Sequence, residues 1–205
     1  MNKDDRRLLV QMLMIIIFNI IVTMSSAVTM WPYSSKVPAP WGWYNAQLFN
    51  AATNTLPDAT GNGNDAYTSG NVQYGSGSSN GAAAYVFYIT GDTTGTVSWP
   101  TGSIETTFTI CSVSRYIQNA GANFRILQGK STNWVHGHWS NHRGVGSYGG
   151  TWLTALDSNR YPVSVNILTN WLIMCSKNSG TYPKNVLIDG ITAGVTSGVA
   201  EAVTP

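Results

Sequence analysis

The sequence predicts an all-β chain, an antiparallel β-sandwich preceded by one N-terminal transmembrane helix. Only 10% of the 205 residues are charged, whereas Gly, Trp and Tyr are frequent, at 21, 8 and 10 residues. This composition is typical of a β-rich domain with a polar surface. After the N-terminal region, short apolar runs are bounded by Gly, Asn, Asp or Pro, and no amphipathic helical pattern separates them. This arrangement favours antiparallel sheets.

The chain divides into four parts. Residues 1–7 form a basic head, residues 8–28 a transmembrane anchor, residues 29–49 a connector rich in Pro and Trp, and residues 50–205 the sandwich. The last part is long enough to bury a core as a single domain.

The anchor is predicted from an apolar run over residues 8–24 that has only three polar interruptions. Extended to Val28, a helix would be about 30 Å long at about 1.5 Å per residue, which matches a bilayer core. A cleaved signal peptide is the alternative, because residues 25–27, Ser-Ser-Ala, fit a cleavage site with small residues.

Basic residues cluster before this run and not after it: Lys3, Arg6 and Arg7 precede it, and Lys36 alone follows closely. This asymmetry predicts a single-pass protein with a cytoplasmic N-terminus and the domain across the bilayer, in a virion membrane or capsid shell or at a cell surface. In the connector, Trp31 and Tyr33 fit an interfacial aromatic belt.

Strands are expected in eight short runs. They cover residues 82–90, 104–116, 124–129, 133–139, 163–167, 171–177, 185–188 and 191–195. The clearest turn is Asp189-Gly190, which lies between two apolar runs and supplies both positive-φ positions of a tight hairpin.

The two cysteines lie on separate predicted strands. In residues 104–116, alternation buries Ile104, Phe108 and Ile110, so Cys111 shares the opposite face with threonines. Cys111 and Cys175 could meet if the two strands are neighbours. Two reduced core cysteines are the equal alternative.

Residues 56–66, Leu-Pro-Asp-Ala-Thr-Gly-Asn-Gly-Asn-Asp-Ala, resemble the opening loop of concanavalin A-like lectin/glucanase domains of the laminin G-like type. Similar segments follow in the family's order at residues 108–111, 126–139 and 185–190, so the resemblance covers about residues 50–196. It implies a jelly roll of two antiparallel sheets. It does not imply an activity, because this fold hosts many functions.

The opening loop is a candidate calcium site. Lectin-like members of the family often bind Ca²⁺, and this loop is rich in oxygen ligands from Asp58, Asn62, Asn64 and Asp65. The alternative is that Asn and Asp occupy turn positions for their backbone conformations. No other cofactor is expected.

A second candidate site is a histidine-containing strand. His136 and His138 lie two apart and so point the same way, with His142 nearby, a spacing that could hold zinc. The alternatives are a polar strand face and a glycan or partner contact. The candidate contact residues are Trp134, His136, His138, Trp139 and Tyr148.

Catalysis is not expected. The glucanases of the superfamily carry Glu-x-Asp-x-Glu, because retaining hydrolysis needs two close carboxylates, whereas this chain has only Glu105 and Glu201. Residues 77–81 match G-x-S-x-G and residues 144–149 match G-x-G-x-x-G, but neither is expected to open a helix.

The expected function is therefore that of a membrane-anchored, non-enzymatic structural or interaction protein, such as a minor capsid component of a membrane-containing large virus. Its partners would be a lipid bilayer and neighbouring protein subunits. Nucleic acid is not expected, because the basic residues are scattered. The alternatives are a cell-surface lectin-like module that binds glycans through exposed Trp and Tyr, and a secreted lectin with a cleaved signal peptide. The lack of any N-x-[ST] acceptor site favours the structural protein.

Overall fold

The computed structural model describes residues 39–118, 125–130, 133–140, 142–148, 151–152, 169–179 and 185–193. Within these residues the prediction of an all-β chain is confirmed. Among the described residues, every strand pairing is antiparallel, and the one helical element is the short 3-10 turn η1 (Ala46–Leu48). The predicted anchor lies outside the described residues. Among those described, no helix is long and apolar enough to span a bilayer.

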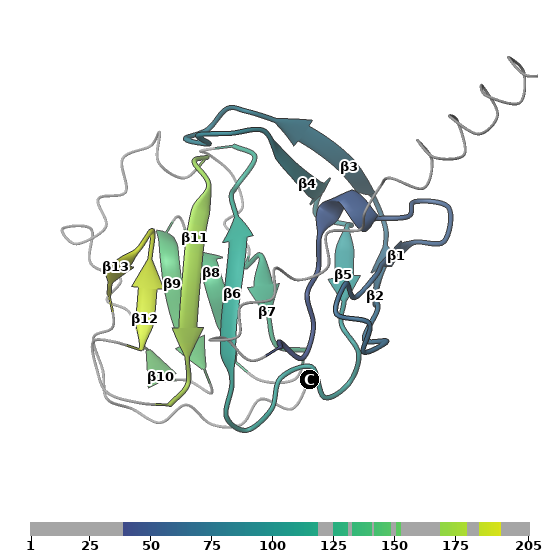
Figure 1. Cartoon of the computed structure of the whole chain (residues 1–205). Helices are drawn as coiled ribbons and strands as arrows, with labels where there is room; N and C mark the ends of the chain where they lie inside the picture. Colours follow the sequence, from purple (N-terminus) through teal and green to yellow (C-terminus); the bar gives the residue numbers. More distant parts are fainter. Residues whose placement is uncertain are drawn as a thin grey trace, which may run out of the picture.

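Two four-stranded sheets form the main body of the domain (Figure 1). One has the order β10-β9-β8-β7, with β7 (Leu127–Gln128), β8 (Val135–Trp139), β9 (His142–Tyr148) and β10 (Thr151–Trp152). The other has the order β13-β12-β11-β6, with β6 (Thr109–Ser114), β11 (Leu172–Lys177), β12 (Val186–Ile188) and β13 (Ile191–Thr192).

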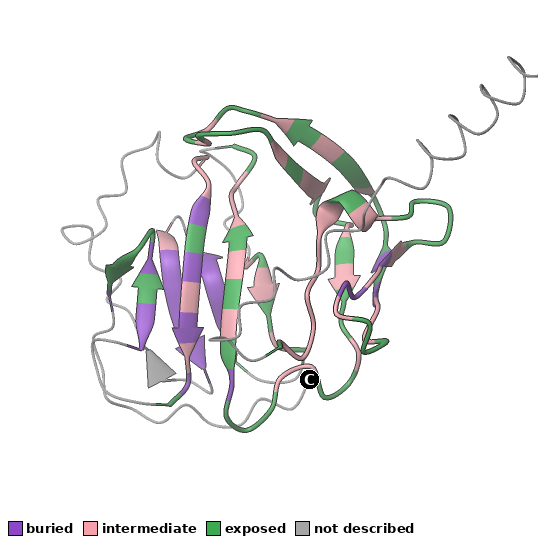
Figure 2. Cartoon of the chain, in the orientation of Figure 1, coloured by how far each residue is buried: buried purple, intermediate pink, exposed green. Residues whose placement is uncertain are grey.

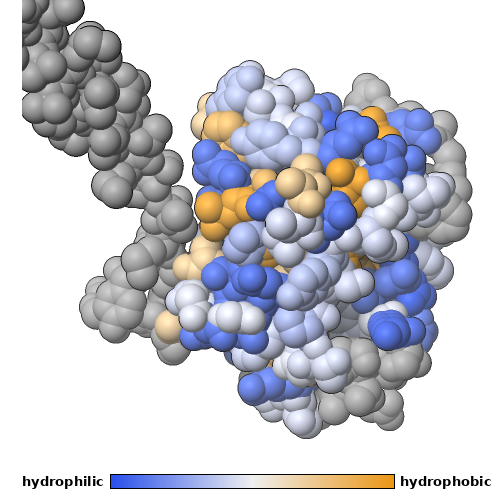
Figure 3. Space-filling model, turned by 90° about the vertical axis from the view of Figure 1, so that its right-hand side faces the viewer, coloured by the Kyte–Doolittle hydropathy of each residue, from blue (hydrophilic) through white to orange (hydrophobic). Residues whose placement is uncertain are grey.

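The other strands form two smaller sheets. A three-stranded sheet has the order β1-β2-β5, with β1 (Thr55–Leu56), β2 (Ala66–Ser69) and β5 (Thr96–Ser98). A separate two-stranded sheet pairs β3 (Val72–Gly77) with β4 (Val86–Gly91) and lies at the top of the view in Figure 1. On the side of the molecule shown in Figure 3, hydrophobic residues lie in small groups among hydrophilic ones.

The core lies between the two four-stranded sheets, and alternation along each strand decides what enters it. On β11, Leu172 and Met174 are fully buried, whereas Ile173 between them is 56% exposed. Figure 2 shows this alternation along β11 and β12. Phe108, just before β6, packs edge-on against Tyr148 of β9, with ring centroids 5.0 Å apart. Side chains from both sheets therefore fill one core.

The two sheets approach closely at Gly144. A Cβ built there would lie only 2.5 Å from Cδ1 of Ile188 on the opposite sheet, and the φ of Gly144 is +75°. Both the space and the backbone conformation therefore require glycine.

The Asp189-Gly190 hairpin turn is confirmed. Both residues have positive φ, 50° and 84°, and the turn joins β12 to β13. In the segment around β6, Phe108 is buried as predicted, whereas Ile104 and Ile110 are only half-buried. Cys111 is exposed, as are Thr107 and Thr109. The strand predicted at residues 163–167 lies outside the described residues.

The cysteines form a disulfide, which decides between the two alternatives. Cys111 on β6 and Cys175 on β11 are directly opposite in the strand register, with Cα atoms 4.1 Å apart. The bond lies on the outer face of its sheet, because Cys111 is exposed and Cys175 half-buried. It joins strands 64 residues apart in sequence.

The described part of the connector, residues 39–49, is joined to the domain. Tyr44 forms a β-bridge with Asp58, and the Ala59 amide donates to the Trp43 carbonyl at 2.8 Å. The Tyr44 ring meets Trp99 edge-on, with centroids 6.1 Å apart. This part of the aromatic connector therefore packs on the domain.

Candidate functional site

The opening loop is organised around the Asp58 carboxylate. Its Oδ1 accepts hydrogen bonds from the backbone amides of Trp43 and Thr60, both at 3.0 Å. Its Oδ2 accepts from the Thr60 hydroxyl at 2.7 Å and from the Asn64 amide at 3.4 Å. The side chain is only 7% exposed. Burial alone would raise the pKa of Asp58, but the hydrogen bonds from Thr60, Trp43 and Asn64 together lower it, so the carboxylate stays ionised.

The other predicted calcium ligands lie in the same loop. Asp65 accepts a hydrogen bond from the Asp58 amide at 2.8 Å. The amide nitrogens of Asn62 and Asn64 donate to the Trp41 carbonyl at 3.1 and 2.8 Å. These bonds tie the loop to the connector.

Asp58, Asn62, Asn64 and Asp65 are thus gathered in one place, as a calcium site requires, but their bonds here are internal to the protein. A bound Ca²⁺ would have to replace hydrogen bonds that the Asp58 oxygens already accept. In the described part of the chain, no group of three or more His, Cys, Asp or Glu side chains has the geometry of a metal site. Calcium binding by this loop stays a prediction.

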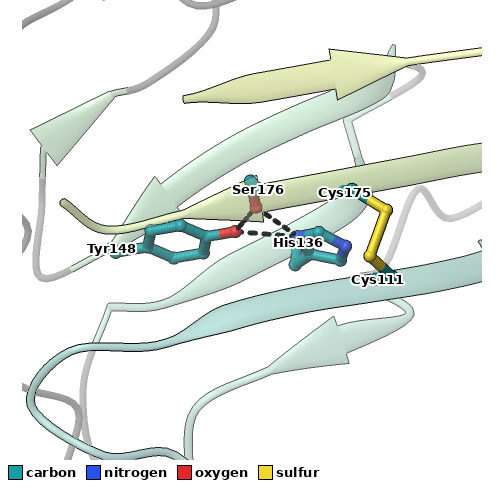
Figure 4. Close-up of a disulfide and its surroundings, with 5 residues drawn as sticks. All are labelled: Cys111, His136, Tyr148, Cys175 and Ser176. Carbon is teal, nitrogen blue, oxygen red and sulfur yellow. Dashed lines mark hydrogen bonds between the residues drawn. A yellow bond between two sulfur atoms is a disulfide. The ribbon is translucent and has the colours of Figure 1, made fainter. Parts of the chain in front are cut away.

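His136 lies in a polar network between the two sheets (Figure 4). Its Nδ1 is 2.8 Å from the hydroxyl of Tyr148 on β9 and 3.1 Å from the hydroxyl of Ser176 on β11. The two hydroxyls also hydrogen-bond to each other. All three side chains are buried, so this network links the sheets from inside the core.

His138 is equally buried. Its Nδ1 lies 3.2 Å from the Ser114 hydroxyl of β6, and the Tyr116 ring meets it edge-on, with centroids 4.8 Å apart. The ladder shifts register between Gly137 and His138, where Gly137 has a φ of +99°. Both histidines still enter the core.

Both histidines are held neutral. Burial lowers the pKa of His136 to about 4, although a hydrogen bond to the Met174 backbone acts in the opposite direction. Burial, together with the nearby charges of Arg143 and His136, lowers the pKa of His138 to about 3. The two rings therefore act as polar core residues at neutral pH.

A glycan or partner contact through Trp134, His136, His138 and Tyr148 requires exposed side chains. The structure buries all four, at 4% exposure or less, because the strand face that carries them packs against the opposite sheet. Trp139, the fifth predicted residue, is half-buried, and the Arg125 guanidinium lies 5.9 Å from its ring centroid. His142 sits apart, with its Nδ1 2.6 Å from the Ser140 carbonyl.

Two exposed features have no counterpart among the predicted site residues. The first is the aromatic strip, which we define as Tyr74, Tyr85 and Phe87 on the β3-β4 hairpin, exposed by 47, 62 and 40%. The sequence of residues 85–89, Tyr-Val-Phe-Tyr-Ile, could have indicated this strip. Aromatic residues at both odd and even positions indicate a strand that carries aromatic side chains on both faces.

The second feature is the outer apolar row, which we define as Val113, Ile173 and Leu187 around the disulfide. Val113 pairs with Ile173 and Leu187 pairs with Cys175, so all lie on one face. Their exposed fractions are 58, 56 and 40%. Period-2 alternation could have identified these residues, but only as the face opposite the core.

Comparison of the chain with protein-family models, with curated proteins and with solved structures gave no match.

Proposed function

We propose that this chain is a membrane-anchored, non-enzymatic structural protein that assembles with other copies of itself through the outer apolar row. Its domain would be a concanavalin A-like jelly roll. Two facing four-stranded antiparallel sheets and the order of the family-like segments in the sequence support that fold.

The observation that carries the proposal is the composition of the outer face of β6, β11 and β12. Three aliphatic side chains and a disulfide lie together on the outer face of this sheet, where a soluble surface usually carries polar residues. At the edge of this face, Asp189 forms an ion pair with Arg143 at 2.8 Å. An apolar centre with a polar rim is the usual anatomy of a protein interface.

Charge and geometry favour a second copy as the partner. The sequence after residue 27 has eight basic and seven acidic residues, so identical domains would not repel one another strongly. Anchors in a common bilayer would also hold the domains at the same height and raise their effective concentration. A row that faces its own copy would form a two-fold symmetric contact.

The test is the association state of the full chain in detergent micelles, measured by sedimentation velocity. We expect the wild type to associate. Ile173→Asp and Val113→Asp should yield monomers, because each would bury a charge in the contact. Both positions are more than half exposed, so the fold should tolerate the change.

The matched control is Tyr67→Asp, because Tyr67 is also exposed, at 60%, but lies on β2. This variant should associate like the wild type. A monomeric wild type, or association that survives Ile173→Asp, would contradict the proposal.

A further inference from the structure

The β3-β4 hairpin lies across the ends of two strands of the sheet β13-β12-β11-β6 (Figure 1). Its Tyr88 ring packs on Trp171, just before β11, with centroids 5.6 Å apart. The guanidinium of Arg115, just after β6, lies 5.9 Å from the Tyr88 ring centroid and 5.2 Å from that of Trp171. The Trp171 amide also donates to the carbonyl of Asn80, in the loop between β3 and β4, at 2.9 Å. The hairpin is therefore fixed at one end of these strands.

The aromatic strip lies on the face of the hairpin that points away from those strand ends. Phe87 follows Ser76 across the ladder, and Tyr74 lies two residues before Ser76, so all three share a face. Tyr88, next to Phe87 in sequence, points to the other face, toward the domain. The Tyr74 and Phe87 rings are 14° apart in plane with centroids 6.2 Å apart, and the Tyr85 ring lies 5.8 Å from that of Phe87. Three neighbouring exposed rings thus form one contiguous patch.

The connector reaches the domain beside this hairpin. Its element η1 lies next to β4 (Figure 1). The predicted anchor ends at residue 28 and the described chain begins at residue 39, so ten residues separate them. Even when fully extended, ten residues span only about 33–36 Å. A chain anchored through residues 8–28 therefore keeps the hairpin side of its domain within reach of the bilayer surface.

The composition of the hairpin suits a lipid surface without net charge. Residues 66–91 contain no Asp, Glu, Lys, Arg or His. A strongly anionic partner would need cationic side chains, which this segment lacks. Aromatic residues favour the headgroup region of a bilayer, and the tyrosine ring can enter it while its hydroxyl stays hydrated. The strip combines two tyrosines with one phenylalanine, and a contiguous exposed patch of this kind is typical of a contact surface.

We propose that the aromatic strip docks on the headgroup region of the bilayer that holds the anchor, an inference that rests on the membrane anchoring proposed above. Docking orients the domain. Because the hairpin lies across the ends of β6 and β11, these strands stand upright on the membrane when the strip faces the lipid. The outer apolar row lies on a face of their sheet, so it then points sideways, toward a neighbouring anchored copy. The strip thus presents the row for self-association.

The test measures how close the strip lies to lipid headgroups. The chain has two cysteines, and both are in the disulfide, so Ser76→Cys provides a single reactive thiol for an NBD fluorophore. The labelled full chain is reconstituted into phosphatidylcholine vesicles at a high ratio of lipid to protein. Part of the phosphatidylcholine carries a nitroxide on its headgroup, which quenches a fluorophore nearby. We expect strong quenching at position 76, and the same quenching after addition of anionic phosphatidylglycerol, because the hairpin carries no charge.

Matched variants make the result specific to the strip. The same label introduced by Ile191→Cys should be quenched weakly, because Ile191 is 68% exposed on β13, away from the hairpin (Figure 1). Phe87→Asp, combined with Ser76→Cys, should lose most of the quenching, because a charge in the strip favours water over the bilayer interface. Tyr67→Asp, which places a charge at an exposed position of β2, should leave the quenching at position 76 unchanged.

Equal quenching at positions 76 and 191, or quenching that survives Phe87→Asp, would overturn the docking. So would a label at position 76 that enters an apolar environment only when copies are crowded in the vesicles, because the strip would then face a second copy. Carbonate washing and sedimentation of the same chain test the proposed function separately. A chain that stays in the vesicles and associates without quenching at position 76 refutes the docking alone, whereas a chain that carbonate removes refutes both.

Discussion

Individual polar residues in this chain act mainly by holding the fold together from inside. His136, Tyr148 and Ser176 come from three strands and meet between the sheets. The Asp58 carboxylate likewise collects four hydrogen bonds from its own loop and the connector. A buried polar group that is paired specifies which strands face each other, because any other arrangement leaves it unsatisfied.

The buried histidines predict a loss of stability in mild acid. In the unfolded chain they take up protons near pH 6.5, whereas in the folded protein His136 and His138 do so only near pH 4 and 3. Between these values the unfolded state binds more protons. The free energy of unfolding should therefore be constant above pH 6.5 and fall as the pH drops toward 4, by about 1.4 kcal/mol per pH unit for each histidine.

Urea unfolding monitored by Trp fluorescence between pH 7.5 and 4.5 measures this slope. His136→Gln should reduce the slope of the free energy of unfolding against pH by about the contribution of one titrating histidine. Ser176→Ala breaks the same network without removing a titrating group, so it should lower stability at every pH and keep the slope. The depressed pKa of Asp58 affects stability in a more acidic range than the histidines do. The stabilisation that it contributes is present above pH 3.8, the ordinary pKa of the group, and is lost as the pH falls below that value. A pH-independent stability from 7.5 to 4.5 would contradict the burial of neutral histidines.

At the scale of single elements, the sheet β13-β12-β11-β6 is held by both a ladder and a covalent bond. Strands β6 and β11 pair over six positions, and the disulfide lies within that ladder. The hydrogen bonds already set the register, so the disulfide contributes chiefly by restricting the unfolded chain.

Reduction of Cys111–Cys175 should therefore lower the free energy of unfolding by about 2–4 kcal/mol, given the loop of 64 residues that the bond closes. The strand signal in circular dichroism should persist at 25 °C. Unfolding of the full chain with and without reductant measures the difference. The Cys111→Ala/Cys175→Ala double variant is the control, because its stability should not respond to reductant. Equal stability of the oxidised and reduced wild type would show that the bond does not constrain the unfolded state.

At the scale of the whole molecule, the proposed function depends on the anchor at residues 8–28, which is predicted from hydrophobicity. The full chain should remain in carbonate-washed membranes or purified particles, and mass spectrometry should detect the peptide of residues 1–6. Ile16→Arg should release the protein, because a charge at the centre of the span costs about 2.5–3.5 kcal/mol. Asn19→Ala, in the same run, should stay in the membrane. A mature chain that begins at Val28 would contradict the anchor and favour the secreted alternative.

Local patterns in the sequence predicted several elements correctly for physical reasons. Asp189-Gly190 was recognisable because few residues tolerate positive φ at two successive positions. Strand β11 was recognisable because period-2 alternation separates Leu172 and Met174 from Ile173. By contrast, β3 was not among the predicted strands, because residues 68–81 are rich in Gly and Ser and show no alternation of apolar side chains. In the structure the Tyr88 ring covers one of its glycines, Gly75.

The sequence by itself determined the all-β class and which residues of a strand share a face. Turn chemistry and side-chain alternation are properties of neighbouring residues, so they can be read along the chain. Only the tertiary structure decided which faces are inside. His136, His138 and Tyr148 look like surface polar residues along the chain, yet the opposite sheet covers them. Tyr74 and Phe87 look like core residues, yet they are 47 and 40% exposed. Burial depends on what lies opposite in space, and residues distant in sequence supply that partner.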